Sequence, residues 1–185
     1  GFMRPTLLKN NERTFKTLGV DVISFTPNWK IVKKVMLEAL IRKGDFCWHC
    51  HTGIFSYPMH IAIKYNTPLV LWGEPQSEYT AYYDYRDNEI EVVDETRFNK
   101  FTNLGITAED MRGMIDNDQS IDPRDFAPYT YPNLRDLKKL RYQSVCLGSF
   151  IPWDTKTQSQ LIMDELGWEG DEVEGMPPKI YDYEK

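Results

Sequence analysis

The chain reads Cys47-Trp-His-Cys-His51 and, a short way further on, Pro68-Leu-Val-Leu-Trp-Gly-Glu74. Two of its three cysteines and two of its three histidines fall in the first segment. The second segment has the length and apolar composition of a strand buried on both faces, as in parallel sheets. We therefore expect a thiol-rich loop, a helix and a buried strand in succession, which is part of a crossover unit of a parallel sheet.

The segments before the cysteines continue the alternation of helices and strands. Apolar spacing predicts a helix over 6–18 that ends at Gly19, with its leucines and Phe15 inward. A β-branched run at 20–25 predicts a strand. The next helix is expected over 29–43, capped by the side chain of Asn28 and followed by Gly44.

The segments after the cysteines carry similar signals. We expect the helix that follows them to open at Thr52 or Gly53 and to reach about Tyr65, with Pro58 producing a kink unless it lies in the first turn. Four further elements have ordinary helix or strand patterns: a short helix after the capping-box spacing Thr107–Asp110, a helix at 132–141, a strand at 144–147, and a helix from Asp154 to about Leu166.

These elements predict an α/β fold, a Rossmann-like parallel sheet with flanking helices and an irregular insertion, which we expect to be incomplete. Residues 1–73 would form part of a nucleotide-binding domain that carries the cysteine motif. Residues 74–130, rich in Tyr, Asp and Asn, would be an insertion over the carboxyl edge of the sheet. Residues 131–168 would complete the domain, and 169–185 would be an acidic linker or truncated tail.

Composition restricts the classes of function. The chain has 185 residues, 41% hydrophobic and 27% charged, and a formal net charge of -6, which argues against a broad nucleic-acid-binding surface. No apolar run has the length of a membrane span, and no secretory signal opens the chain. Three cysteines, an odd number, suit a reducing compartment better than a disulfide framework. We therefore expect a cytoplasmic protein.

The cysteine motif offers two kinds of chemistry. Cys47 and Cys50 are spaced to bind one metal ion or to form one disulfide, although two partly buried loop cysteines would give the same pattern. His49 and His51 are candidate metal ligands or proton donors, and His51 is also a candidate catalytic residue. Cys146 is either a third ligand or, from its place within a strand, part of the core.

The carboxyl end of the expected strand is the second candidate site. Gly73 allows the backbone to approach a ligand, and Glu74 lies where carboxylates often hold Mg²⁺ or a ribose. We take Trp72, Gly73 and Glu74 as candidate nucleotide-binding residues and Glu74 as a candidate catalytic residue. A solvated loop acid remains the alternative for Glu74. The sequence contains neither GxxxxGK[ST] nor GxGxxG.

Four ordered motifs together resemble the N-acetyl sugar amidotransferase family. They are Phe25-Thr-Pro-Asn28, Gly44-Asp-Phe-Cys-Trp-His-Cys-His-Thr-Gly53, Pro68-Leu-Val-Leu-Trp-Gly-Glu74 and Leu147-Gly-Ser-Phe-Ile-Pro-Trp-Asp154. These are bacterial enzymes of surface-polysaccharide assembly, including lipopolysaccharide O-antigen. They belong to the PP-loop ATP pyrophosphatases, within the adenine nucleotide alpha-hydrolase-like superfamily. The resemblance covers most of the chain.

The resemblance implies an ATP- and Mg²⁺-dependent reaction on a nucleotide-linked N-acetyl sugar. ATP would adenylate the acetamido oxygen, and ammonia from a glutaminase-type partner would displace AMP to give an acetamidino group. By position, Trp72, Gly73 and Glu74 would line the nucleotide site, and Cys47, Cys50 and His51 would belong to the cysteine motif. Zn²⁺ or an iron–sulfur cluster at Cys47 and Cys50 is a further expectation.

The chain departs from the family in one respect. The phosphate loop of the family, Ser-Gly-Gly-x-Asp-Ser, lies upstream of the matching segment and does not occur in this sequence. We therefore expect a fragment of a longer enzyme, with little ATP binding and no turnover on its own.

Two other hypotheses fit the cysteine motif. The first is a tRNA-thiolating PP-loop enzyme, in which Cys146 would be the third ligand of an iron–sulfur cluster, although the acidic charge counts against it. The second is a non-catalytic interaction module in which the cysteines form a zinc knuckle.

Overall fold

The computed structural model describes residues 3–73, 94–116, 121–152 and 154–170. The chain divides into two compact units, Gly1–Thr26 with Pro152–Lys185, and Pro27–Ile151. The four segments predicted from the sequence, 1–73, 74–130, 131–168 and 169–185, stay a prediction. The insertion and the acidic tail among them lie in part outside the described residues.

The smaller unit is built on two helices, α1 (Pro5–Leu18) and α7 (Thr155–Leu166), which contact each other. The buried Asn10 side chain donates to the Glu169 carbonyl at 2.8 Å and accepts from its N–H at 3.1 Å. Asp154 caps α7 by accepting from the N–H of Lys156 at 3.1 Å, and the helix ends at Gly167, which has a left-handed backbone. The predicted start and end of α7 are therefore confirmed.

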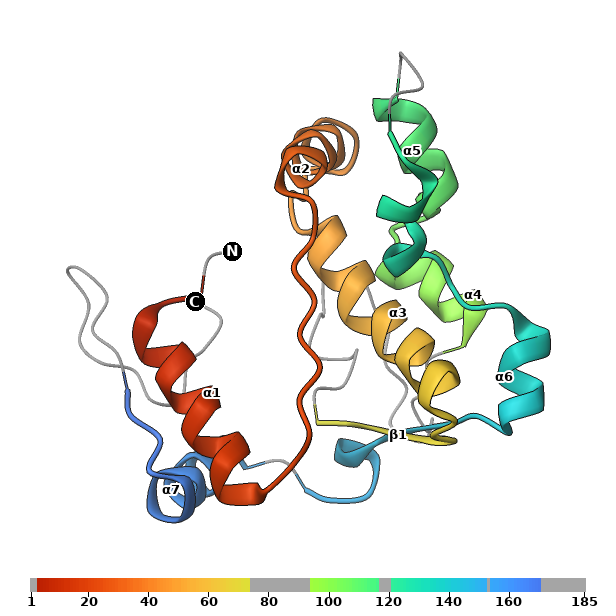
Figure 1. Cartoon of the computed structure of the whole chain (residues 1–185). Coiled ribbons are helices and arrows are strands. Elements are labelled where there is room, and N and C mark those ends of the chain that lie inside the picture. Colours follow the sequence, from red (N-terminus) through yellow and green to blue (C-terminus); the bar gives the residue numbers. More distant parts are fainter. Residues whose placement is uncertain (1–2, 74–93, 117–120, 153, 171–185) are drawn as a thin grey trace. The chain divides into compact units, whose positions relative to one another are not determined.

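The first part of the larger unit follows the order helix, cysteine turn, helix, strand. Asn28 caps α2 (Trp29–Lys43) by accepting from the Lys30 N–H at 3.2 Å, as predicted. The chain then forms α3 (Trp48–Tyr65) and β1 (Leu69–Trp72). Figure 1 shows α3 descending from beside α2 toward β1.

The second part of the larger unit is a series of short elements. In chain order these are α4 (Glu95–Arg97), the π-helical turn η2 (Phe98–Thr102), α5 (Ala108–Ile115), the 3₁₀ turns η3 (Pro123–Asp125) and η4 (Ala127–Tyr129), α6 (Leu134–Leu140), β2 (Gln143–Cys146) and the 3₁₀ turn η5 (Leu147–Ser149). The capping box predicted from Thr107 and Asp110 is present at the start of α5.

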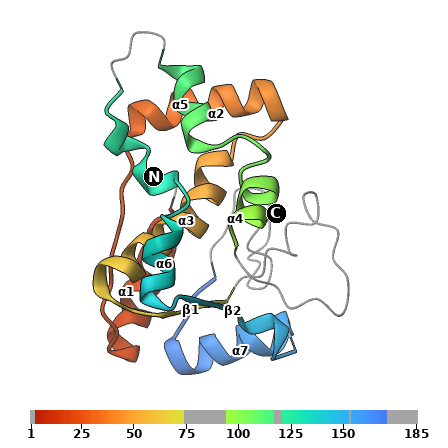
Figure 2. The ribbon, with the colours of Figure 1, turned by 90° about the vertical axis from the view of Figure 1, so that its right-hand side faces the viewer.

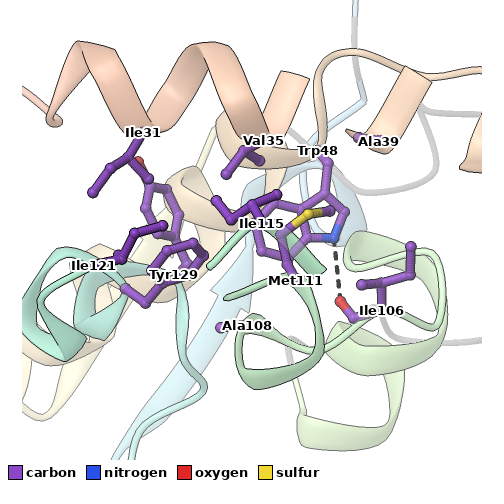
Figure 3. Packing of buried hydrophobic residues seen from close by; sticks show 11 residues of the cluster. Ile31, Val35, Ala39, Trp48, Ile106, Ala108, Met111, Ile115, Ile121 and Tyr129 are labelled. Carbon is purple, nitrogen blue, oxygen red and sulfur yellow. Dashed lines mark hydrogen bonds between the residues drawn. The ribbon is translucent and has the colours of Figure 1, made fainter. Parts of the chain in front are cut away.

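The larger hydrophobic cluster lies where α2, the start of α3, and α5 meet (Figure 3). Trp48 is fully buried in it, and its indole Nε1 donates to the carbonyls of Asn103 at 3.0 Å and Ile106 at 3.2 Å. Ile106, Met111, Ile115, Ile121, Phe126 and Tyr129 supply much of the apolar surface. The described residues of the predicted insertion therefore form part of the core.

The two strands pair in parallel, with Trp72 opposite Cys146 and Leu69 opposite Gln143 (Figure 2). A short helix, α6, precedes β2 and contacts α3. The fold class is thus mixed α/β and mostly helical, with a parallel strand pair. The wider Rossmann-like sheet stays a prediction.

The expected burial of β1 on both faces is wrong. Val70 and Trp72 face the second hydrophobic cluster, whereas Leu69 and Leu71, which point the other way, are 44% and 56% exposed. Parallel strands are buried on both faces only when helices cover both. Among the described residues, this strand pair has apolar cover on one face.

Three other local predictions are wrong. Residues 20–25 are not a strand, because they pair with no strand in the described chain, and Val20, Val22 and Ile23 are exposed. Leu8, Phe15 and Leu18 of α1 are exposed rather than inward. Helix α3 begins at Trp48, four residues before the predicted Thr52, whereas its end at Tyr65 is as predicted.

None of the helices in the described ranges is long and apolar enough to cross a membrane.

The structure predicts that Trp48→Phe lowers the free energy of unfolding by about 2–4 kcal/mol. The substitution removes the indole donor from two carbonyls and leaves a space in the larger cluster. Urea unfolding of the variant measures the loss. Trp29→Phe is the matched control, since Trp29 is exposed at the start of α2, and it should cost no more than about 0.5 kcal/mol. Equal losses for the two variants would contradict the role of Trp48.

Candidate functional site

The cysteine motif forms the first turn of α3. Cys47 is the N-cap residue, and its carbonyl accepts from the N–H of Cys50 at 2.8 Å and from that of His51 at 3.1 Å. The side chain of Asp45 accepts from the Cys47 N–H at 2.6 Å. The predicted cysteine loop is therefore a helical turn. It is restrained by Asp45, which lies before it, and by the buried Trp48, which lies within it.

The three cysteines are thiols in different surroundings. Cys50 is exposed, Cys47 is half-buried and Cys146 is buried. Burial raises the pKa of the Cys47 thiol, and the neighbouring Asp45 carboxylate and Cys50 raise it further. Cys50 therefore presents the accessible sulfur of the pair.

The two histidines of the motif are both half-buried. Burial lowers the pKa of His49, against an opposing contribution from the backbone of Phe46, and nearby His51 lowers it further. His49 is therefore neutral over a wider pH range than an ordinary histidine, as a metal ligand or proton acceptor would have to be.

The carboxyl end of β1 is the second part of the candidate site. Trp72 is buried, its ring lies 5.2 Å from that of Phe55, and its Nε1 donates to Ser144 Oγ at 2.8 Å. Gly73 is exposed, and no described atom lies within 4 Å of where a Cβ would stand. Glu74 lies outside the described residues.

Strand pairing brings two of the sequence motifs to one edge. Because β1 and β2 are parallel and Trp72 lies opposite Cys146, the chain leaves both strands at the same edge, at Gly73 and Leu147. Ligands of open α/β proteins bind at this edge. Trp72 and Gly73 of the candidate nucleotide site thus adjoin the start of the motif that runs from Leu147 to Asp154.

Helix α3 packs against β1 near that edge. The two elements contact each other, and the ring of Phe55 lies 5.2 Å from that of Trp72. Cys50 precedes Phe55 by five residues, about 7.5 Å along the helix axis. The cysteine turn therefore begins the helix whose middle contacts the last residue of β1.

Cys146 does not join the other two cysteines. It packs with Phe55, Met59, Trp72 and Phe98 in the second cluster. In the described part of the chain, no group of three or more His, Cys, Asp or Glu side chains is placed to hold a metal ion. Cys47 and Cys50 therefore supply two sulfur atoms, and the described residues do not complete a four-ligand site.

No family model matches this chain, and no curated protein matches it either.

Several residues that shape the site carry no sequence signal of their own. Asn103 is buried, accepts from Thr52 Oγ1 at 3.0 Å and donates to Asn99 Oδ1 at 3.2 Å, which ties η2 to α3. Tyr129 packs 3.3 Å from the position that a Cβ on Gly53 would take. Gly53 ends the cysteine motif, and its role here is to admit this ring. A glycine within a helix was the only hint of such a close approach.

The thiols are predicted to react with iodoacetamide in the order Cys50, Cys47, Cys146. Exposure favours Cys50, and the raised pKa of Cys47 means that its rate continues to rise at a pH where that of an ordinary thiol has levelled off. Peptide mass spectrometry over a series of pH values measures each rate. Modification of Cys146 in the folded chain as fast as Cys50 would contradict the structure.

Proposed function

We propose that this chain is part of an ATP-dependent amidotransferase that converts the acetamido group of a nucleotide-linked sugar to an acetamidino group, in the synthesis of a surface glycan such as O-antigen. The proposal includes a Rossmann-like nucleotide-binding domain of the PP-loop type and a glutaminase-type partner that supplies ammonia. It rests first on the four motifs that resemble the N-acetyl sugar amidotransferases.

One structural observation supports the proposal beyond sequence resemblance. Trp72 lies opposite Cys146 in a parallel pair, so the motif ending in Gly73-Glu74 and the motif beginning at Leu147 leave the sheet at the same edge. The cysteine turn begins α3, whose Phe55 contacts Trp72 at the end of β1. Two motifs far apart in the sequence would have to adjoin in this way if they line one substrate site.

The chemistry needs an activated amide, because an amide oxygen is a poor leaving group. Transfer of the adenylyl group of ATP to the acetamido oxygen releases pyrophosphate. Attack of ammonia on the carbonyl carbon of the acetamido group then releases AMP. Gly73 would let the protein backbone approach the ligand closely, since no described atom lies within 4 Å of where its Cβ would stand. Glu74 and His51 are the candidates for proton transfer, and Glu74 is the candidate for Mg²⁺ binding. A site shielded from water would protect the adenylate from hydrolysis.

The described residues do not hold every group that the reaction requires. No phosphate-binding loop occurs in the sequence, so the triphosphate must be bound by residues other than those described. Zn²⁺ or an iron–sulfur cluster does not fit the two thiols as a closed site, and no step of the proposed reaction depends on either. The tRNA-thiolating alternative needs Cys146 beside Cys47 and Cys50, whereas Cys146 packs in the core of the strand pair.

The proposal predicts that pyrophosphate release over many turnovers requires a nucleotide-linked N-acetyl sugar and ammonia together. The protein produced from its full natural reading frame is assayed with ATP and a panel of such sugars, and the product is identified by mass spectrometry. A sugar product one mass unit lighter is expected, since oxygen is replaced by NH. Pyrophosphate release that is independent of the sugar would overturn the proposal.

A matched pair of glycine variants tests the place of the site. Gly73→Val should lower kcat/KM at least about tenfold, about 1.4 kcal/mol in transition-state binding, by filling the space a ligand would use. Gly113→Ala, in α5, also meets no described atom within 4 Å and should leave kcat/KM unchanged. Both variants should fold, as thermal melting will show. Full activity in a folded Gly73→Val variant would contradict a ligand site at this edge.

A further inference from the structure

We propose that Cys47 and Cys50 form a reversible dithiol–disulfide pair, oxidised by small disulfides such as glutathione disulfide. This inference does not rest on the proposed amidotransferase function. It concerns what the first turn of α3 does with its two sulfur atoms, whatever substrate the protein binds.

The backbone already brings the two cysteines within disulfide range. The hydrogen bond from the Cys50 N–H to the Cys47 carbonyl, 2.8 Å long, closes a turn of four residues. Such a turn keeps its first and last Cα atoms less than about 7 Å apart. Disulfides join Cα atoms about 4.4–6.8 Å apart, so the bond can form by side-chain rotation with little movement of the backbone.

Two interactions restrain the turn. Asp45 accepts from the Cys47 N–H at 2.6 Å. Trp48, which lies between the two cysteines, is buried and donates to two carbonyls of a different segment. An unstructured peptide with the same spacing would lack these restraints. The fold therefore holds the backbones of the two cysteines near each other, which raises the effective concentration of one thiol at the other.

The exposures of the two cysteines suit the two steps of thiol–disulfide exchange. The Cys50 thiolate, which is exposed, attacks one sulfur of glutathione disulfide, forms a mixed disulfide and releases one glutathione thiolate. The half-buried Cys47 then attacks the Cys50 sulfur, forms the internal disulfide and releases the second glutathione. Two electrons pass from the two cysteines to glutathione disulfide, and their two protons end on the two glutathione thiols.

Such a pair has a use in a reducing compartment. Disulfides in cytosolic proteins are mostly transient and serve catalysis or redox sensing. Oxidation here would remove two thiols at the start of α3, the helix whose Phe55 contacts Trp72 of the candidate site. The candidate site would therefore exist in a thiol form and a disulfide form.

The test is a redox titration of the intact chain in anaerobic glutathione buffers. Samples are quenched with acid, alkylated with a maleimide and digested with trypsin, which leaves both cysteines on the peptide 44–64. We expect this peptide to lose both alkylation sites together and to become two hydrogens lighter, while Cys146 stays a thiol. The folded chain should be half-oxidised at several-fold less glutathione disulfide than the chain in urea.

Cysteine variants and a metal control complete the test. Cys47→Ser should stop at the mixed disulfide on Cys50, and Cys50→Ser should react little, because its remaining thiol is half-buried. Three results would overturn the proposal: only glutathione adducts on the natural chain, equal midpoints in the folded and unfolded chain, or one equivalent of Zn²⁺ that is retained through dialysis and keeps both thiols from oxidation.

Discussion

The indole of Trp72 joins the three elements on which the candidate site is built. Its ring packs on Phe55 of α3, its Nε1 donates to Ser144 of β2, and its backbone belongs to β1. The two strands paired in the described residues have little stability of their own. The side-chain packing around Trp72 therefore determines where the strands end relative to the helix, and with it where Gly73, Leu147 and the cysteine turn lie.

The sequence predicted those features that depend on local chemistry. Helix ends follow from caps that act within a few residues, so Asn28, the Thr107 capping box and Asp154 are all found where their side chains indicated. The strand at Leu69–Trp72 was predicted from its composition. The parallel pairing followed from the helix that separates consecutive strands, since a connection of that kind returns the chain in the same direction.

The features that the sequence did not reveal depend on contacts between distant residues. Residues 20–25 have strand composition, but a strand needs a partner, and the described chain provides none for them. Helix α3 starts early because Trp48 is buried against Asn103 and Ile106, more than fifty residues away in sequence. Likewise, the separation of Cys146 from the other cysteines follows from its register opposite Trp72, which no spacing along the chain could show.

The most direct measurement is a double-mutant cycle on Phe55 and Trp72, because it tests whether α3 lies against the end of β1. The cycle uses Phe55→Leu, Trp72→Leu and the double variant, each unfolded in urea. Packed aromatic pairs contribute about 0.5–1.5 kcal/mol beyond their burial, and the account predicts a favourable coupling of that size. Losses that add to within about 0.3 kcal/mol would mean that the two rings do not touch, and that α3 does not lie against the end of β1.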